Sequence, residues 1–377
     1  MDLSNLFNFP KIVVQAFALL SAPQVLASAS VPGANVPEIH VPSGFKVSIY
    51  ATATEGARSM ALGDDGTVYV GTRDIGKVYA IRDRNGDGTA DDVRVLVENL
   101  EMPNGVATLK GDLYIADMTG IRRVRAALLK SDKPVAPETI FEGFPAKKRH
   151  GWRYLKVGPD GLLYTAIGVP CNICLPEGPY EGRLIRLDPS HPVPEILAEG
   201  LRNSVGLEFR SGARDLWLTD NGRDWLGDDI PPDELNHWTG TMVHFGYPVC
   251  HGKAVIDPDY GQPGNCRDKR TPEWEFPAHM ASLSVHFYRG SMFPDLKDQL
   301  LVVQHGSWNR SSPVGYRIAS VEFVNGAPSA VHVFADGWLQ SDGMVLGRPV
   351  DTLELPDGSL LVSDDHADVI YRISKSP

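Results

Sequence analysis

The chain has 377 residues, 42% of them hydrophobic, and a formal net charge of −11 at pH 7. A net negative charge repels a phosphate backbone, so nucleic-acid binding is not expected. The 37 glycines and 29 prolines are typical of an all-β fold with many turns between short strands. Beyond the N-terminal region, no stretch reaches the ~18 apolar residues that a membrane-spanning helix needs.

The N-terminus resembles a secretory signal. Lys11 precedes a largely apolar run over residues 12–20, and Ala27-Ser28-Ala29 fits the small-residue pattern of a signal-peptidase site. We therefore predict a signal peptide at residues 1–29 and a periplasmic or secreted chain over residues 30–377. An N-terminal tail without a targeting role is the alternative.

A single unit recurs along the rest of the chain. It consists of an apolar strand, a turn, a second strand and a loop. The six copies have their strand pairs at 60–62 and 68–70, 106–107 and 113–115, 155–157 and 162–164, 205–209 and 216–218, 286–288 and 300–303, and 350–355 and 360–362. Several turns carry Asp-Gly, which supplies the positive φ values of tight hairpins.

This repeat predicts a six-bladed β-propeller of four-stranded antiparallel blades. A solenoid is the competing repeat fold. A closed ring is favoured because a lone strand at residues 45–50 can complete the last blade. In a propeller, the loops that lead into the first strands and the loops that follow the second strands share one face. That face receives Arg58, Asn104, His150, Arg202, Asn203 and Arg348, together with residues 220–223, 304–310 and 364–366.

A histidine surrounded by arginines suits proton abstraction beside an anionic or electron-accepting partner. Imidazole titrates near neutrality and can act as a base. Guanidinium groups hold and stabilise negative charge. For any one of these residues taken alone, the alternative to a catalytic or binding role is an ordinary solvated position on the surface.

Four cysteines fit an exported chain, because disulfides persist in oxidising compartments. We expect the bridges Cys171–Cys174 and Cys250–Cys266, one of three possible pairings. A Cys-x-x-Cys pair also begins a c-type haem site, but Leu175 stands where the haem histidine would be.

The order of motifs resembles the soluble quinoprotein sugar dehydrogenases, and in particular their sorbosone dehydrogenase branch. The motifs are His150 with Leu155-Lys156-Val157-Gly158-Pro159-Asp160-Gly161, then Gly200-Leu201-Arg202-Asn203-Ser204-Val205-Gly206-Leu207, Asn221-Gly222-Arg223, Asp233-Glu234-Leu235-Asn236 and Phe245-Gly246-Tyr247-Pro248. The resemblance spans residues 41 to 373. It implies oxidation of an aldose, sorbosone or a similar sugar-derived aldehyde by hydride transfer to pyrroloquinoline quinone (PQQ) with Ca²⁺, and a quinone or cytochrome as the electron acceptor.

The same resemblance implies roles for individual residues. His150 corresponds to the general base, and Arg202 to the arginine that stabilises charge on the reduced cofactor. Asn203, Arg348 and, less closely, Asn104 correspond to cofactor contacts. The backbone carbonyls of Gly222 and Arg223 correspond to the calcium ligands.

Two positions depart from the glucose-oxidising branch. Arg149 stands where that branch has an aspartate before its base, which puts the choice of sugar in question. Residues 304–310 hold no lysine where that branch has a cofactor-binding one, and Arg310 or His305 is the expected substitute.

A second calcium candidate is the loop with Asp83, Asn85, Asp87 and Asp91, which resembles the first half of an EF-hand loop. Its twelfth position is Arg94 rather than glutamate, and a metal-free hairpin turn is the alternative. We expect this loop on the face opposite His150.

Residues 236–280 are too long for a simple connection within a blade and are expected to be an insertion. Two other functions stay open for the whole chain: a calcium-dependent lactonase-type propeller hydrolase and a non-catalytic binding propeller.

Overall fold

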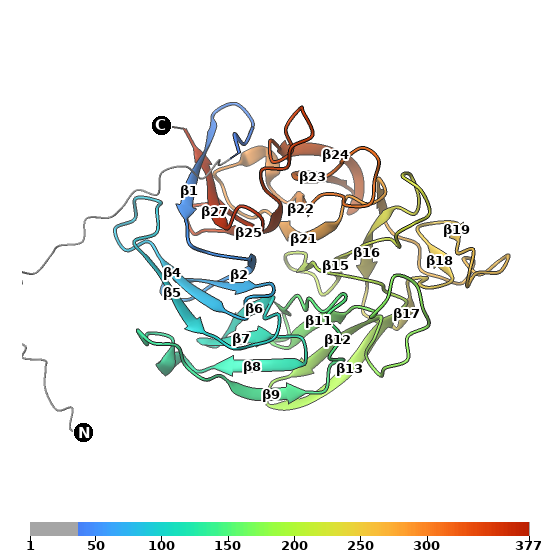
Figure 1. The fold of residues 1–377 in the computed structure, drawn as a ribbon, viewed down its shortest axis with the longest axis horizontal. Coiled ribbons are helices and arrows are strands. Elements are labelled where there is room, and N and C mark those ends of the chain that lie inside the picture. Colours follow the sequence, from blue (N-terminus) through green and yellow to red (C-terminus); the bar gives the residue numbers. More distant parts are fainter. Residues whose placement is uncertain (1–36, 377) are drawn as a thin grey trace, which may run out of the picture. The chain divides into compact units, whose positions relative to one another are not determined.

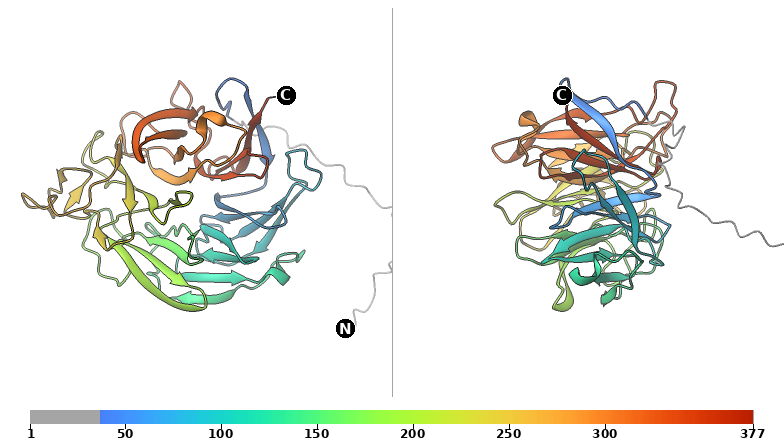
Figure 2. Two further views of the ribbon diagram at one scale, coloured as in Figure 1. Left: turned by 180° about the vertical axis from the view of Figure 1, so that it is seen from behind. Right: turned by 90° about the vertical axis from the view of Figure 1, so that its left-hand side faces the viewer.

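The computed structural model describes residues 37–376, so the predicted signal peptide at 1–29 lies outside the described residues. Six sheets of antiparallel strands surround a common centre (Figure 1), which confirms the predicted six-bladed β-propeller. Seen from behind, the blades follow one another around the same centre (Figure 2). Within the described part of the chain, no helix is long and apolar enough to cross a membrane.

The first three blades consist of β2 (Ala57–Leu62), β3 (Val68–Thr72), β4 (Val78–Arg82) and β5 (Asp92–Val97); β6 (Gly105–Leu109), β7 (Asp112–Ala116), β8 (Gly120–Val124) and β9 (Glu138–Glu142); and β10 (Lys156–Val157), β11 (Leu163–Ile167), β12 (Arg183–Asp188) and β13 (His191–Glu199). A 3-10 helix, η1 (Ala126–Leu128), lies between β8 and β9. The predicted strand pairs are therefore the first and second strands of these blades.

The last three blades consist of β14 (Leu207–Phe209), β15 (Leu216–Asp220), β16 (Asp233–Trp238) and β20 (Trp274–Phe276); β21 (Ser282–Phe287), β22 (Leu300–Gln304), β23 (Arg317–Val324) and β24 (Ala327–Ala335); and β25 (Pro349–Glu354), β26 (Leu360–Asp364), β27 (Val369–Lys375) and β1 (Phe45–Ala51). A second 3-10 helix, η2 (Pro294–Leu296), precedes β22.

The first strands of the blades line the centre of the ring. Strand β2 contacts β6 and β25, and β21 contacts β14 and β25. The second strands are fully buried in β3, β11, β15, β22 and β26, because apolar side chains on both faces of each sheet pack against the neighbouring blades. Most of the hydrophobic core therefore lies between the blades, and a small apolar cluster of Val205, Leu283 and Val350 joins three blades near the first strands.

Strand β1 closes the ring. It pairs antiparallel with β27, with Val47 opposite Ile373 (Figure 1). The lone strand predicted at residues 45–50 thus completes the blade made by the last three strands. The predicted Asp-Gly turns also form, with φ of 80° at Gly66 and 75° at Gly161.

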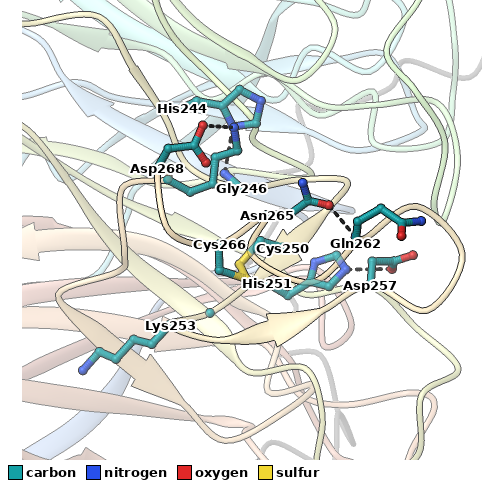
Figure 3. Close-up of a disulfide and its surroundings, with 12 residues drawn as sticks. His244, Gly246, Cys250, His251, Lys253, Asp257, Gln262, Asn265, Cys266 and Asp268 are labelled. Atoms are coloured by element: carbon teal, nitrogen blue, oxygen red, sulfur yellow. Dashed lines mark hydrogen bonds and ion pairs between the residues drawn. A yellow bond between two sulfur atoms is a disulfide. The ribbon is translucent and has the colours of Figure 1, made fainter.

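The insertion is shorter than predicted. Strands β16 and β20 are hydrogen-bonded neighbours in one blade, so only residues 239–273 lie outside it. The predicted bounds of 236–280 took in the last three residues of β16 and all of β20. The insertion contains β17 (Val243–His244), which pairs parallel with β13 of the neighbouring blade. Its hairpin of β18 (Cys250–His251) and β19 (Val255–Ile256) lies beside the Cys250–Cys266 disulfide (Figure 3). The Cys171–Cys174 disulfide also forms, so both predicted pairings are confirmed.

A charged network lies at the end of the first strands, close to the hairpin turns. The Glu208 carboxylate, 2% exposed, accepts hydrogen bonds from Lys156 Nζ at 2.6 Å and Arg289 Nη2 at 3.1 Å. His286 Nδ1 lies 3.4 Å from the same carboxylate. Burial alone would raise the pKa of Glu208, but the charges of Lys156 and His286 lower it well below its usual value.

Removing Glu208 is therefore expected to destabilise the ring. Glu208→Ala leaves Lys156 without its carboxylate, and breaking such a buried pair costs about 3–5 kcal/mol of unfolding free energy. Urea unfolding followed by tryptophan fluorescence measures the change. The control is Glu195→Ala, which removes an exposed partner of Arg186 and is expected to cost below about 1 kcal/mol. Equal losses of unfolding free energy in the two variants would show that the buried Glu208 network does not stabilise the ring.

Candidate functional site

A cavity of about 550 Å³ opens on the face predicted from the repeat. That volume lies within the range of small-molecule sites. Its lining includes seven predicted residues from different parts of the chain: Arg58, His150, Arg202, Asn203, Gly222, His305 and Arg348. The cavity is thus built from the loops that lead into first strands and the loops that follow second strands.

His150 is buried at the side of this cavity, 7% exposed. Its Nδ1 lies 2.8 Å from the Val169 carbonyl oxygen. A carbonyl only accepts hydrogen bonds, so Nδ1 carries the proton and Nε2 keeps its lone pair. Burial and, second to it, the charge of Arg202 hold the pKa of His150 well below its ordinary value. His150 is therefore a neutral imidazole at neutral pH, and its basic Nε2 has no partner among the described residues.

The backbone around His150 fixes the ring in this position. His150 has a φ of +52°, which is uncommon for a residue other than glycine. Gly168 lies so close that a Cβ there would stand 2.7 Å from the His150 Cβ. The absence of a side chain at Gly168 therefore allows the imidazole to pack against the end of β11.

The Arg202 guanidinium is held by the loop between the cysteines of the first disulfide. Its Nε and Nη2 donate to the backbone oxygen and Oδ1 of Asn172, both at 2.8 Å. Nη2 also donates to Asp224 Oδ2 at 3.0 Å, and Nη1 donates to the Asn221 carbonyl at 3.1 Å. Among the described residues, one Nη1 hydrogen is left without a partner. Arg202 is thus fixed in orientation and still has a donor to offer.

Asp220 holds the backbone of the turn formed by Arg202, Asn203 and Ser204. Its carboxylate accepts the backbone N–H groups of Arg202 at 2.9 Å and Asn203 at 2.7 Å, and the Ser204 hydroxyl at 2.9 Å. Burial raises the pKa of Asp220 to about 6. The end of β15 therefore fixes the turn that places Arg202 and Asn203 on the cavity.

The loop after β15 carries the predicted calcium ligands. Gly222 lines the cavity, and its N–H donates to Asp233 Oδ1 at 3.1 Å. Arg223 turns its side chain toward the insertion, where Nη1 contacts Asp257 Oδ2 at 2.6 Å and Asp259 Oδ2 at 2.9 Å. The carbonyls of Gly222 and Arg223 accept no hydrogen bond from the residues that the structure describes. The insertion therefore supports this loop.

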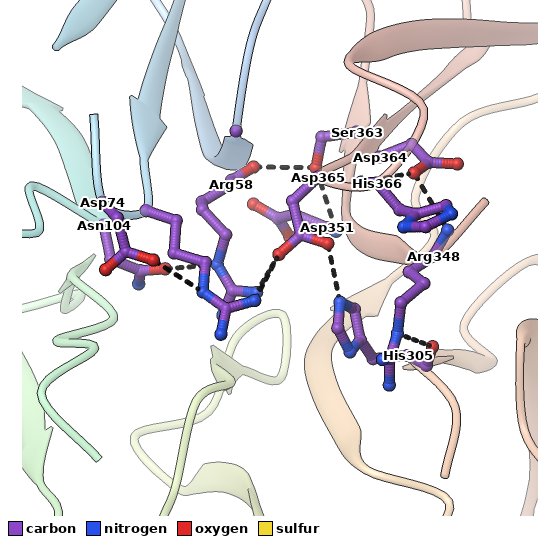
Figure 4. Close-up of polar contacts among 12 residues, drawn as sticks. Arg58, Asp74, Asn104, His305, Arg348, Asp351, Ser363, Asp364, Asp365 and His366 are labelled. Atoms are coloured by element: carbon purple, nitrogen blue, oxygen red, sulfur yellow. Dashed lines mark hydrogen bonds and ion pairs between the residues drawn. The ribbon is translucent and has the colours of Figure 1, made fainter. Parts of the chain in front are cut away.

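A second charged cluster lies across the cavity (Figure 4). Asp365 accepts from Arg58 Nη1 at 2.9 Å and bonds His305 Nε2 at 2.7 Å. Arg348 Nε donates to the His305 carbonyl at 3.3 Å. Burial lowers the pKa of His305 to about 4, despite the opposing effect of Asp365. Asp365 thus orients Arg58, and the loop after β22 orients Arg348.

Two predicted cofactor contacts lie elsewhere. Asn104, 1% exposed, lies beneath the cavity, where its Oδ1 accepts Arg58 Nε at 2.9 Å and its Nδ2 donates to the Arg153 carbonyl at 3.2 Å. Arg310 is not part of the lining, because its guanidinium donates to the carbonyls of Asp228 and Ala278. Asn104 positions Arg58, and Arg310 joins two loops.

The Asp83 loop joins β4 to β5 on the opposite face, as predicted. Its side-chain oxygens accept its own backbone N–H groups: Asp83 Oδ1 from Gly86 at 2.7 Å, Asn85 Oδ1 from Asp87 at 2.8 Å and Asp87 Oδ1 from Thr89 at 2.8 Å. Asp91 Oδ2 accepts from Arg84 N at 2.7 Å. No group of three or more His, Cys, Asp or Glu side chains within residues 37–376 is arranged to hold a metal ion. These hydrogen bonds fix the shape of the loop, and calcium binding there stays a prediction.

Five residues of the lining were not assigned from the sequence: Arg73, Trp152, Asp224, Asp233 and His279. Arg73 follows the second strand of its blade, so the same rule that found residues 220–223 would have found it. Trp152 contacts two guanidinium groups, with its ring centroid 5.7 Å from Arg58 Cζ and 5.2 Å from Arg73 Cζ. No spacing signal marks Asn172, because only its contacts relate it to Arg202.

Three family models match the chain. The description "Domain of unknown function (DUF7133)" matches residues 32–242, more than half of the chain. "Glucose / Sorbosone dehydrogenase" matches residues 182–307, and "TrAA12-like" matches residues 254–374. The second of these models covers Arg202, Asn203, Gly222 and Arg223, which are among the residues on which the resemblance was based.

Similar proteins span nearly the whole chain. An uncharacterized protein of Borreliella burgdorferi is 32% identical over 373 residues, covering 95% of this chain and 96% of the other. The calcium structure of the Trichoderma reesei carbohydrate-active enzyme of family AA12 has a TM-score of 0.78 at 20% identity, covering 91% of this chain and 98% of that one. The holo PQQ domain of Coprinopsis cinerea pyranose dehydrogenase has the same TM-score at 18% identity, covering 91% and 99%. These structures share the fold of the chain, and the "Glucose / Sorbosone dehydrogenase" model over residues 182–307 bears out the predicted resemblance to that family.

Proposed function

The chain belongs to the DUF7133 family and is a relative of the glucose/sorbosone dehydrogenases, and we propose that it is a quinoprotein dehydrogenase oxidising a sugar or sugar-derived aldehyde. The observation that carries this proposal is the buried, neutral His150, whose Nε2 is free in a cavity lined by five arginines: Arg58, Arg73, Arg149, Arg202 and Arg348. A base among fixed cations suits the removal of a proton from a neutral hydroxyl while negative charge develops beside it.

The cavity fits PQQ, a planar tricarboxylate. Arg348, Arg202 and Asn203 would hold it, together with Arg58 and Arg73 on the other side. Two residues of the lining each carry a buried polar atom without a partner among the described residues, Trp152 Nε1 and Asn309 Oδ1. A ligand that reached these atoms would satisfy one donor and one acceptor. Bound there, PQQ would supply the two-electron acceptor that no side chain can provide.

The loop after β15 fits Ca²⁺. The carbonyls of Gly222 and Arg223 would be its protein ligands, since neither oxygen is used by another described residue and calcium prefers oxygen ligands. The ion would act as a Lewis acid beside the cofactor.

The chain's own residues divide the remaining work. His150 Nε2 takes the proton of the substrate hydroxyl, and Val169 keeps the imidazole in the required tautomer. Arg202 directs its unused N–H toward the charge that develops in the cavity. Asn172 and Asp224 act by holding Arg202, and Asn104 acts by holding Arg58.

Reconstitution tests the proposal. The purified protein is supplied with PQQ and Ca²⁺, then with a panel of aldoses and sorbosone, and reduction of an artificial electron acceptor is followed. Sugar-dependent reduction supports the proposal. Hydrolysis of lactones with Ca²⁺ alone, without acceptor reduction, would instead establish the lactonase alternative. Against that alternative, the two carboxylates of the lining, Asp224 and Asp233, already accept protein N–H groups.

We further propose a periplasmic or secreted location and a quinone or cytochrome as the natural electron acceptor. Both disulfides support an oxidising compartment.

Asn172→Ala is expected to reduce turnover. The variant removes the Oδ1 acceptor of Arg202 Nη2 and the Nδ2 donor to the Asp224 carbonyl. Hydrogen bonds to charged groups contribute about 1.5–3 kcal/mol, so about a tenfold loss of kcat is expected. Steady-state kinetics with the reconstituted enzyme measures it. Asn85→Ala, in the loop on the opposite face, is the control, and equal kcat values in the two variants would show that Asn172 does not position Arg202.

A further inference from the structure

Two exposed tryptophans stand together at the mouth of the cavity. Trp225 is 67% exposed and Trp308 is 60% exposed. Their ring centroids are 5.3 Å apart and their planes meet at 86°. Trp308 lines the cavity that contains His150. Large aromatic side chains contribute most when buried, so an exposed pair at a cavity mouth marks a surface that a ligand covers.

The two loops that carry this pair come from neighbouring blades and are bonded to each other. Asn309 Nδ2 donates to Asp224 Oδ1 at 2.9 Å. Ser311 N donates to Asp228 Oδ1 at 3.1 Å, and the Arg310 guanidinium donates to the Asp228 carbonyl. The tryptophans are therefore held in place before any ligand arrives, which reduces the entropy lost on binding.

The chemistry of the pair suits a sugar ring. The face of an indole carries partial negative charge and attracts the C–H groups on the face of a pyranose ring. Beside it lies a polar group for the sugar hydroxyls, the guanidinium of Arg149, whose side chain is 48% exposed. Two indole rings present far less than the ~800 Å² per partner of a stable protein interface. The pair is therefore matched to one small ring and not to a protein surface.

We propose that Trp225 and Trp308 form a subsite for a second sugar ring, so that the substrate class is an oligosaccharide whose end enters the cavity. This inference rests on the proposed function, because it names the substrate of the same site. The first ring lies in the cavity near His150, and the next ring stacks on the tryptophans outside it.

Binding to the protein without PQQ tests the subsite independently of turnover. Isothermal titration calorimetry compares glucose with two trisaccharide probes, maltotriose and cellotriose. We expect at least one trisaccharide to bind about tenfold more tightly than glucose, and the double variant Trp225→Ala/Trp308→Ala to lose that advantage. The control is Tyr260→Ala, an exposed aromatic of the insertion, which is expected to keep it. Thermal unfolding of each variant confirms that it is folded.

The reconstituted enzyme gives the second measurement. The ratio of kcat/KM for the better trisaccharide to kcat/KM for glucose is expected to fall about tenfold in the double variant and to stay unchanged in Tyr260→Ala. Equal binding of glucose and both trisaccharides, or undiminished trisaccharide binding by the double variant, would overturn the inference. The inference would also be overturned if the double variant bound trisaccharides normally but transferred electrons more slowly to a protein acceptor. Trisaccharide binding without any PQQ-dependent oxidation would retain the subsite and refute the proposed function.

Discussion

His150→Asn is expected to reduce turnover by about 10²–10⁴-fold, the usual contribution of a general base, and to leave PQQ binding intact. Asparagine tolerates the positive φ of this position better than alanine does. It lacks the basic Nε2. Stopped-flow kinetics measures turnover, and a PQQ titration followed by tryptophan fluorescence measures binding. Unchanged turnover would remove His150 from the mechanism.

The pH dependence of the wild-type enzyme follows from the same residue. Burial and Arg202 lower the pKa of His150 well below 6.5, so the neutral, basic form persists as the pH falls through the range in which an exposed histidine would be protonated. We therefore expect the acid limb of kcat/KM to lie below pH 6.5. An acid limb at or above pH 6.5 would show that the base is another group or that His150 is not desolvated.

Arg202→Gln is expected to lower kcat by about 10²–10³-fold, as removal of a fixed donor from an oxyanion-type site does. Glutamine replaces the charge with a single amide and leaves Asp224 with Asn309 as its nearest donor. Transient kinetics separates cofactor affinity from the rate of its reduction, and the larger loss is expected in the rate.

The control for this prediction is Arg125→Gln. It removes an exposed arginine that pairs with Glu138 and is not part of the cavity lining. It is expected to leave both parameters unchanged. A loss confined to cofactor affinity in Arg202→Gln would mean that Arg202 holds the cofactor without stabilising developing charge.

Short sequence motifs predicted the ring of blades and several of the residues that line the cavity. Asp-Gly turns between apolar strands mark three of the six hairpins. A propeller brings the loops at the other end of those strands to one face. His150, Arg202 and Arg348 could therefore be placed together before their contacts were known. The lone strand predicted at 45–50 is β1, which closes the ring by pairing with the otherwise unpaired outer edge of β27.

Contacts between distant loops could not be predicted in this way. Asn104 occupies the expected position, but the guanidinium of Arg58 draws its amide beneath the cavity. Arg310 binds the Asp228 loop of a neighbouring blade, a pairing that no sequence spacing reveals. The end of the insertion was misjudged because the short strand β20 returns to its blade after residues 239–273 with no turn signal of its own.

The absorption spectrum of PQQ bound with Ca²⁺ tests the central claim most directly, since it reports the oxidation state of the cofactor in a single turnover. Sugar is added to the reconstituted wild type and to His150→Asn without an electron acceptor. We predict rapid conversion to the reduced spectrum in the wild type and conversion slower by at least about 10²-fold in the variant. No spectral change with any aldose or with sorbosone, or equal rates in the two proteins, would contradict the account.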